Sequence, residues 1–123
     1  MSAKIAIVGL GRIGSVVLEQ LLGRQKQGIE IVCVSEMHDT PGRRKAESSR
    51  IPVLSLDEII GQGDKVDMIF DMTGIAEVRK TLREQLFDSN NRHTVVVPEN
   101  VAYLIWSVLS GQPVPGKDHR SGY

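Results

Sequence analysis

The chain has 123 residues, of which 41% are hydrophobic, and its 15 Lys and Arg residues balance 15 Asp and Glu residues. This length predicts a single domain that buries roughly two-thirds of the surface of the unfolded chain. The zero formal net charge argues against nucleic acid or an anionic membrane surface as a partner. The single Cys, the lack of a signal-peptide pattern and the lack of an apolar run of about 20 residues predict a cytoplasmic protein without a membrane span.

Short β-branched runs alternate with longer segments of helical periodicity, a pattern typical of a parallel sheet with helices on both faces. We expect strands at residues 4–8, 29–34, 51–54, 66–70 and 94–97, and helices at about 13–24, 55–61, 76–87 and 100–109. The polar stretch 37–50 is predicted to be partly loop and partly a short helix. The helix at 55–61 begins with Ser55 and Glu58 at the spacing of a capping box.

The first strand, residues 4–8, is almost continuously apolar and is therefore expected at the centre of the sheet. Pro52 cannot donate to a strand ladder, which places the strand at 51–54 on an edge. We therefore predict a three-layer α/β/α Rossmann fold with parallel strand order 3-2-1-4-5 over residues 1–109. Residues 110–123 are rich in Pro and Gly and are predicted to be a flexible tail or linker.

The motif Gly9-Leu-Gly11-Arg-Ile-Gly14 stands directly between a predicted buried strand and an amphipathic helix. In the dinucleotide-binding fingerprint the first glycine allows a tight turn, the second allows close approach of a pyrophosphate, and the third allows the helix to pack closely on the sheet. The following helix N-terminus, with Arg12 and Ile13, favours an anion without a lysine. Arg12 either lies over the pyrophosphate or faces solvent.

Glu36 follows the second predicted strand, 22 residues after Gly14. A carboxylate in this place accepts hydrogen bonds from the adenosine ribose and repels a 2′-phosphate, which favours NAD over NADP. Arg43, Arg44 and Lys45 complicate that preference because a basic loop could reach a 2′-phosphate. Two other readings stay open, namely a glycine turn kept for packing alone and another adenine-containing ligand such as coenzyme A or S-adenosylmethionine.

The other polar residues favour structural roles, and we predict no catalytic residue and no metal site. Cys33 alternates within a predicted strand and is expected to be a buried small hydrophobe. The three histidines, His38, His93 and His119, have no partners at zinc-ligand spacing. Asp71 ends the fourth predicted strand and could either orient a ligand or bind loop N–H groups.

The residues quoted above resemble the N-terminal nucleotide-binding domains of the glucose-fructose oxidoreductase, homoserine dehydrogenase, aspartate dehydrogenase and dihydrodipicolinate reductase families. The resemblance covers about residues 4–98 and includes the run Val66-Asp-Met-Ile-Phe-Asp-Met-Thr73-Gly74. It implies that Thr73 and Gly74 line the nicotinamide side of the cofactor. The resulting predicted cofactor site consists of Gly9, Gly11, Arg12, Ile13, Gly14, Glu36, Thr73 and Gly74.

The chain departs from these families in two places. Oxidoreductases of the glucose-fructose type carry Glu-Lys-Pro after the fifth strand, whereas this chain has Pro98-Glu99-Asn100. Their substrate domain is also not expected here, because only a Pro/Gly-rich tail follows Leu109. The chain is similar in this respect to dinucleotide-binding modules of bacterial signalling proteins, which end in a similar apolar helix.

Three hypotheses follow for the function. The first is an NAD(H)-binding regulatory or sensory domain that forms a homo-oligomer through the helix at 100–109, with a possible signalling or catalytic partner domain. The second is the cofactor-binding half of an NAD(P)-dependent oxidoreductase, present as a fragment or subunit. The third is an oligomerisation or interaction module that binds no cofactor.

Overall fold

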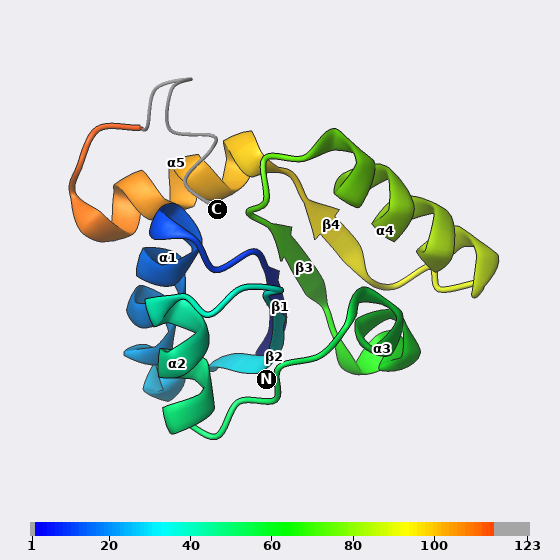
Figure 1. Ribbon diagram of the computed structural model, residues 1–123, viewed down its shortest axis with the longest axis horizontal. Helices are drawn as coiled ribbons and strands as arrows, with labels where there is room; N and C mark the ends of the chain where they lie inside the picture. The colour runs from blue at the N-terminus through cyan, green and yellow to red at the C-terminus, as the bar shows by residue number, and fades with distance from the viewer. Residues whose placement is uncertain (1, 115–123) are drawn as a thin grey trace.

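The computed structural model of the protein describes residues 2–114, and Figure 1 shows a twisted parallel sheet between two helical layers. The strands are β1 (Ala3–Val8), β2 (Ile29–Ser35), β3 (Met68–Asp71) and β4 (Val95–Val97). The α-helices are α1 (Arg12–Leu22), α2 (Pro41–Ser48), α3 (Leu56–Gly61), α4 (Ala76–Asp88) and α5 (Glu99–Ser110), and short 3-10 turns are η1 (Gln25–Gln27) and η2 (Gly63–Lys65). The strand order is β2-β1-β3-β4, which confirms the central position predicted for the first strand.

The two helical layers follow from the alternation of side chains along β1. Ile5 and Ile7 belong to one buried cluster, which α1 and α5 cover, whereas Ala6 and Val8 belong to a second cluster with residues of α3 and α4. Successive residues of a strand point to opposite faces, so an uninterrupted apolar strand needs cover on both sides. Accordingly, α1, α2 and α5 lie to the left of the sheet in Figure 1, and α3 and α4 lie to its right.

The sheet has four strands instead of the predicted five, so the order 3-2-1-4-5 is not confirmed as written. The segment at 51–54 forms a single parallel bridge between Val53 and Val34 beside β2. Pro52 has no N–H to donate, and the N–H of Ile51 is already bonded to the carbonyl of Ala46 at 2.9 Å. With Ser55 serving as the N-cap of α3, too few residues remain for a ladder.

The sequence contains N-cap signals at the starts of the two short helices α2 and α3. The capping box of α3 is present as predicted, with Glu58 N donating to Ser55 Oγ and Ser55 N donating to Glu58 Oε1. In the stretch 37–50, Thr40 accepts a hydrogen bond from Arg43 N at 3.1 Å and Pro41 is the first residue of α2. A threonine N-cap followed by proline is a helix start signal, so the start of α2 was predictable from the sequence.

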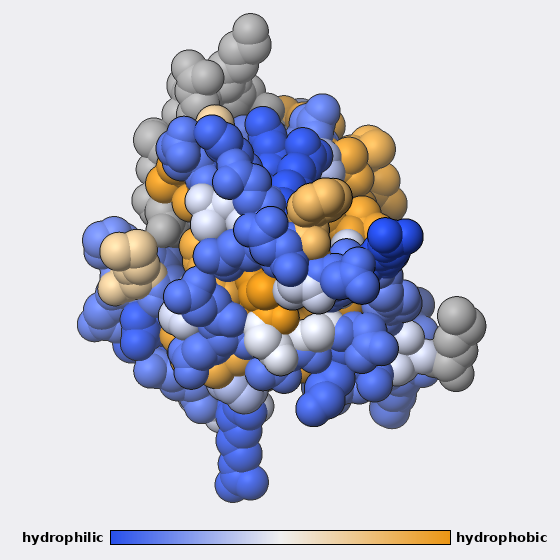
Figure 2. All heavy atoms as spheres, turned by 90° about the vertical axis from the view of Figure 1, so that its right-hand side faces the viewer, coloured by the Kyte–Doolittle hydropathy of each residue, from blue (hydrophilic) through white to orange (hydrophobic). Residues whose placement is uncertain are grey.

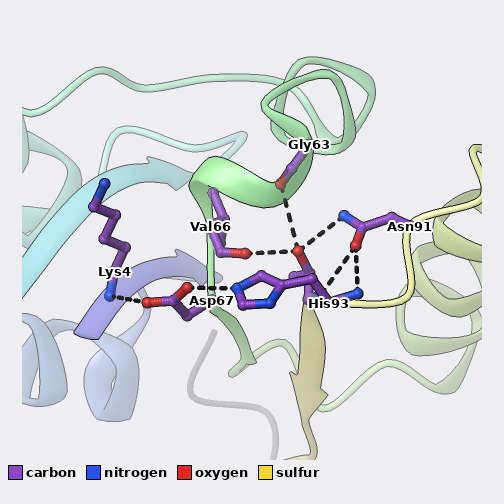
Figure 3. Close-up of polar contacts among 7 residues, drawn as sticks. Lys4, Gly63, Val66, Asp67, Asn91 and His93 are labelled. Carbon is purple, nitrogen blue, oxygen red and sulfur yellow. Dashed lines mark hydrogen bonds and ion pairs between the residues drawn. The ribbon is translucent and has the colours of Figure 1, made fainter. Parts of the chain in front are cut away.

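A polar cluster ties β3 and β4 together at the amino end of the sheet (Figure 3). His93 Nε2 lies 2.6 Å from Asp67 Oδ1, and the backbone N–H of Lys4 donates to Asp67 Oδ2 at 2.8 Å. Asn91 Oδ1 accepts from the backbone N–H groups of His93 and Thr94. The hydrogen bond from His93, followed by that from Lys4, lowers the pKa of Asp67 below its ordinary value.

This lowered pKa predicts a loss of stability in acid. A carboxyl whose pKa is depressed by folding contributes stability above its unfolded pKa, near 4, and that contribution disappears as the pH falls through the lower folded value. We therefore expect urea unfolding to show Asp67→Asn less stable than the native chain at pH 7, with the difference shrinking towards pH 3. The matched control is Asp64→Asn, an exposed position three residues earlier. A difference that is constant from pH 7 to pH 3 would contradict the assignment.

The surfaces of α4 and α5 differ in character. Figure 2 shows the side of the molecule that carries α3 and α4, and this face is mainly hydrophilic. On α5 the exposed large side chains are Val101, Leu104 and Val108, at a spacing that places them on one side of the helix.

No helix of the described residues is long and apolar enough to cross a membrane. Residues 115–123 of the predicted tail, with His119, lie outside the described residues.

Candidate cofactor site

The glycine turn between β1 and α1 lies at the carboxyl end of the sheet, where it contacts both neighbouring strands. Gly9 N donates to Ser35 O at the end of β2 (2.9 Å), and Met72 N donates to Val8 O just after β3 (2.8 Å). The chain leaves β1 for β2 through α1, whereas β3 lies on the other side of β1. This is the switch point of the sheet, where open α/β folds bind their ligands.

Backbone crowding explains two of the three glycines. Gly9 has φ of +94°, and a Cβ built there would lie 3.0 Å from both Met72 C and Thr73 N. A Cβ at Gly14 would lie 2.0 Å from the carbonyl oxygen of Gly9, a contact that no side chain can make. The first glycine therefore permits the turn and its approach to β3, and the third glycine permits α1 to begin against that turn.

Gly11 differs from the other two glycines because its backbone is ordinary. It is the N-cap of α1 with φ of −75°, and no side chain caps this helix end within residues 2–114. Ile13 and Gly14 are buried, and Arg12 is exposed in the first turn. The uncapped N-terminus of a helix presents backbone N–H groups and the positive end of its dipole to an anion.

Glu36 lies beside the glycine turn, as its spacing predicted, but it also has a structural role that the sequence did not reveal. Its side chain is buried, with Oε1 accepting from Leu10 N at 2.6 Å and Oε2 accepting from His38 N at 3.0 Å. The carboxylate therefore joins the end of β2 to the middle of the glycine turn. Each carboxylate oxygen can accept a second hydrogen bond, so this arrangement leaves acceptor capacity for a ribose.

Removing this carboxylate should affect both folding and binding. We expect Glu36→Ala to lower the free energy of unfolding by about 1–3 kcal/mol, because the buried N–H of Leu10 loses its acceptor. We also expect it to weaken NAD⁺ binding more than NADP⁺ binding. Urea unfolding and calorimetric titration measure the two effects, with Glu30→Ala on the exposed face of β2 as the control. An equal loss for both dinucleotides would remove Glu36 from the ribose.

Helix α2 completes this side of the site. Gly42 is buried against α1, since a Cβ there would lie 2.1 Å from Ser15 Oγ and 3.1 Å from Leu10 Cβ. Arg43 donates from its guanidinium to the backbone carbonyl of Glu36. Arg43 was expected in a basic loop that could reach a 2′-phosphate, whereas the structure holds its guanidinium at the end of β2.

The loop after β3 closes the other side of the turn. Asp71 Oδ1 accepts from Thr73 N at 3.1 Å and from Thr73 Oγ1 at 2.7 Å, and Thr73 Oγ1 in turn accepts from Ile75 N. Thr73 is buried and packs against Gly9, so its side chain supports the turn from within. Gly74 is exposed, with φ of +69°, and borders a small pocket with Asp71.

Of the remaining candidates, Cys33 and His93 lie apart from this site, and His38 adjoins Glu36. Cys33 is 1% exposed in β2, and burial raises the pKa of its thiol to about 11, which confirms the expected small hydrophobe. His93 is at the opposite end of the sheet, paired with Asp67, and His38 is exposed in the loop after Glu36. Among residues 2–114 no group of three or more His, Cys, Asp or Glu side chains could hold a metal ion.

Three features together define a Rossmann-type dinucleotide-binding domain. They are a glycine turn at the switch point of a parallel sheet, an uncapped helix N-terminus and an acidic residue at the end of the next strand. The family model for the NAD-binding domain of homoserine dehydrogenase matches residues 9–105. The chain therefore belongs to this family of NAD-binding domains. No curated protein matches the sequence.

Solved structures share the fold at low sequence identity. S. aureus homoserine dehydrogenase at pH 7.0 matches with a TM-score of 0.60 and 20% identity, covering 90% of this chain and 30% of that one. GenD2 from gentamicin A biosynthesis, solved in complex with NAD, matches with a TM-score of 0.58 and 19% identity, covering 89% of this chain and 32% of that one. The chain thus spans about a third of the length of these proteins.

Proposed function

We propose that the chain binds NAD(H) with the pyrophosphate at the N-terminus of α1. The observation that carries this proposal is the glycine turn, in which Gly9 has φ of +94°, Gly14 lies against the Gly9 carbonyl, and no side chain caps the start of α1 by a hydrogen bond. Backbone N–H groups of Gly11, Arg12 and Ile13 would face the phosphates. Glu36 would accept the adenosine ribose hydroxyls, and Thr73 and Gly74 would border the nicotinamide side.

Three features support a preference for NAD over NADP. The Glu36 carboxylate is fixed beside the glycine turn by two backbone N–H groups, where it would repel a 2′-phosphate. The matched family is one of NAD-binding domains, and GenD2 was solved with NAD. Arg43 opposes this preference in part, but its guanidinium already binds the carbonyl of Glu36 and pairs with Glu47 at 3.8 Å.

The function best supported is that of the cofactor-binding part of an oxidoreductase of the homoserine dehydrogenase class. In this role the domain would hold the dinucleotide so that the nicotinamide can exchange a hydride with a substrate. The cofactor supplies the hydride chemistry, and the protein supplies binding and orientation. The chain's own contribution is to fix the pyrophosphate, the ribose and the nicotinamide relative to the sheet. The substrate-binding groups would come from chain beyond the span shared with the solved structures or from a partner.

Calorimetric titration with NAD⁺, NADH, NADP⁺ and NADPH tests this proposal. We expect NAD(H) to bind in the micromolar range and the phosphorylated forms to bind more weakly. If none of the four dinucleotides binds, the glycine turn serves packing alone, and the interaction module is the better hypothesis. If NADP(H) binds more tightly than NAD(H), the assigned role of Glu36 is wrong.

The exposed side of α5 supports a second candidate, a regulatory or sensory module that acts as a homo-oligomer. Val101, Leu104 and Val108 are 41%, 57% and 75% exposed, and the sequence from Asn100 to Val114 contains no Asp, Glu, Lys, Arg or His. An uncharged apolar stripe can pack against its own copy without like-charge repulsion. A difference in affinity for NAD⁺ and NADH between two oligomeric states would make such an assembly responsive to redox state.

Substitution on this stripe tests the oligomer. We expect Leu104→Lys to shift the chain to a monomer in light scattering, because a lysine would meet the lysine of the partner in an apolar contact. The control is Phe87→Lys on α4, which removes an 84% exposed aromatic side chain from a different surface. A native chain that is monomeric with and without NAD(H) would exclude this route to regulation.

A further inference from the structure

The edge strand β4 is held in the sheet by a short ladder. It consists of Val95–Val97 and pairs in parallel with residues Met68 to Phe70 of β3. The sheet order ends at β4, whose outer side pairs with no strand of residues 2–114. So short a ladder contains few hydrogen bonds. Side-chain contacts at its ends therefore matter for how firmly β4 is held.

At the amino end of β4 these contacts come from a polar cluster, here called the β4 clamp, which consists of Asp67, Asn91, His93 and Thr94 (Figure 3). Thr94 Oγ1 donates to Val66 O at 2.6 Å, and His93 Nε2 lies 2.6 Å from Asp67 Oδ1. Asn91 Oδ1 accepts from the N–H of Thr94 at 3.0 Å, which fixes the loop that carries His93. The β4 clamp thus joins the start of β4 to the two residues that lead into β3.

The contact between His93 and Asp67 depends on pH. The two side chains are 55% and 30% exposed, so solvent protons reach the imidazole. A histidine side chain is ordinarily neutral in alkaline solution and positively charged below about pH 6.5. The carboxylate stays charged throughout that range, because the hydrogen bond from His93 lowers the pKa of Asp67. Protonation of the ring therefore turns a hydrogen bond from a neutral donor into a stronger, charge-assisted one.

Other charged groups around this pair come from three elements. Lys4 of β1 donates its backbone N–H to Asp67, and in Figure 3 its ammonium points away from that carboxylate. Asp64 of η2 and Arg92 of the loop before β4 line the same surface depression as His93, of about 730 Å³. Asp64 favours a charged imidazole, and Arg92 opposes it. The Asp67 carboxylate is in direct contact with the ring, so its effect is the largest.

We propose that the β4 clamp is a pH-sensitive contact that holds β4 in the sheet more tightly when His93 is charged. The contribution of the charge is present below about pH 6.5 and is lost as the pH rises, so β4 should open locally more often in alkaline solution. Because α5 begins directly after Pro98, opening of β4 would also loosen the start of α5. The β4 clamp lies at the end of the sheet opposite the cofactor site, so this device is independent of NAD(H) binding.

Amide hydrogen exchange of the whole chain, followed by NMR, tests this device. The reporter is the N–H of Val95, which donates to Asp67 O at 3.0 Å, and its protection is expressed relative to an unstructured peptide at the same pH. We expect this protection to fall about threefold between pH 5.5 and pH 8.5, the size typical of a partly exposed ion pair. Protection should also be lower at Val95 than at Ile7 in the central strand β1, because β4 opens without the rest of the sheet.

Three variants separate the charge from the hydrogen bond. His93→Gln keeps a donor that cannot become charged, and Asp67→Asn removes the opposite charge, so in both variants the protection of Val95 should no longer change with pH. The control is His38→Gln at an exposed histidine after β2, which should retain the threefold change. The proposal is overturned if the native chain shows no change, if either clamp variant keeps the native change, or if Val95 is as well protected as Ile7 at both pH values.

Discussion

Gly14→Ala is expected to destabilise the domain by about 3 kcal/mol or more, at or above the upper end of the usual cost of overpacking. The added methyl group would lie 2.0 Å from the carbonyl oxygen of Gly9 and 3.4 Å from Met72 Cβ. The first of these contacts is with backbone, so no rotamer change can relieve it, and α1 must move away from the sheet. Urea unfolding followed by circular dichroism measures the loss.

The control for this variant is Gly61→Ala at the end of α3. A Cβ at Gly61 meets no atom within 4 Å, and alanine in a helix is ordinarily more stable than glycine by about 0.5–1 kcal/mol. We therefore expect Gly61→Ala to be neutral or slightly stabilising. A Gly14→Ala chain as stable as the native chain would show that α1 does not pack against the turn as described.

Gly11→Val is expected to differ from Gly14→Ala, because it should abolish NAD⁺ binding and leave the stability of the fold unchanged. Gly11 has φ of −75° at the N-cap of α1, a conformation that valine also adopts. Its side chain would occupy the space in which the backbone meets the pyrophosphate. Loss of two hydrogen bonds to a charged group predicts at least an approximately 100-fold weaker affinity for NAD⁺, measured by calorimetry.

Gly23→Ala is the matched control at the other end of α1. Gly23 has φ of −72°, and a Cβ there would make only ordinary contacts, the nearest at 3.7 Å to Gln20 O. Affinity for NAD⁺ should therefore be that of the native chain. Undiminished affinity in Gly11→Val would exclude the pyrophosphate from the start of α1.

Most of the fold could be predicted because its signals are local. The apolar run of β1, the spacing of apolar residues in α1, and the capping box of Ser55 and Glu58 each depend on neighbours in the chain. The prediction failed for residues 51–54, where the β-branched run was real but Pro52 and the adjoining helix caps left a single bridge. Strand length depends on which N–H groups are available, and the N–H of Ile51 is already bonded to the carbonyl of Ala46 near the end of α2.

The sequence predicted which residues lie at the candidate cofactor site, but it did not predict most of the hydrogen bonds and contacts that those residues make. The spacing from Gly14 to Glu36 placed the acidic residue correctly beside the turn, but its bond to Leu10 N joins residues 26 apart in sequence and no local pattern announces it. The contact between the methyl group of Thr73 and Gly9 also joins distant parts of the chain, whereas the hydroxyl of Thr73 binds the nearby Asp71. Arg79 lies on an otherwise ordinary charged helix, and only the folded chain shows that it borders a pocket.

The most direct test of the central claim is to follow the backbone amide signals of the ¹⁵N-labelled protein by NMR while NAD⁺ is added. The claim predicts the largest shifts at Gly9 to Gly14, at Glu36 and at Gly74, with little change at the amino end of the sheet around Asp67 and His93. Saturable shifts that gather at the amino end, or titration without any shift in the glycine turn, would contradict it.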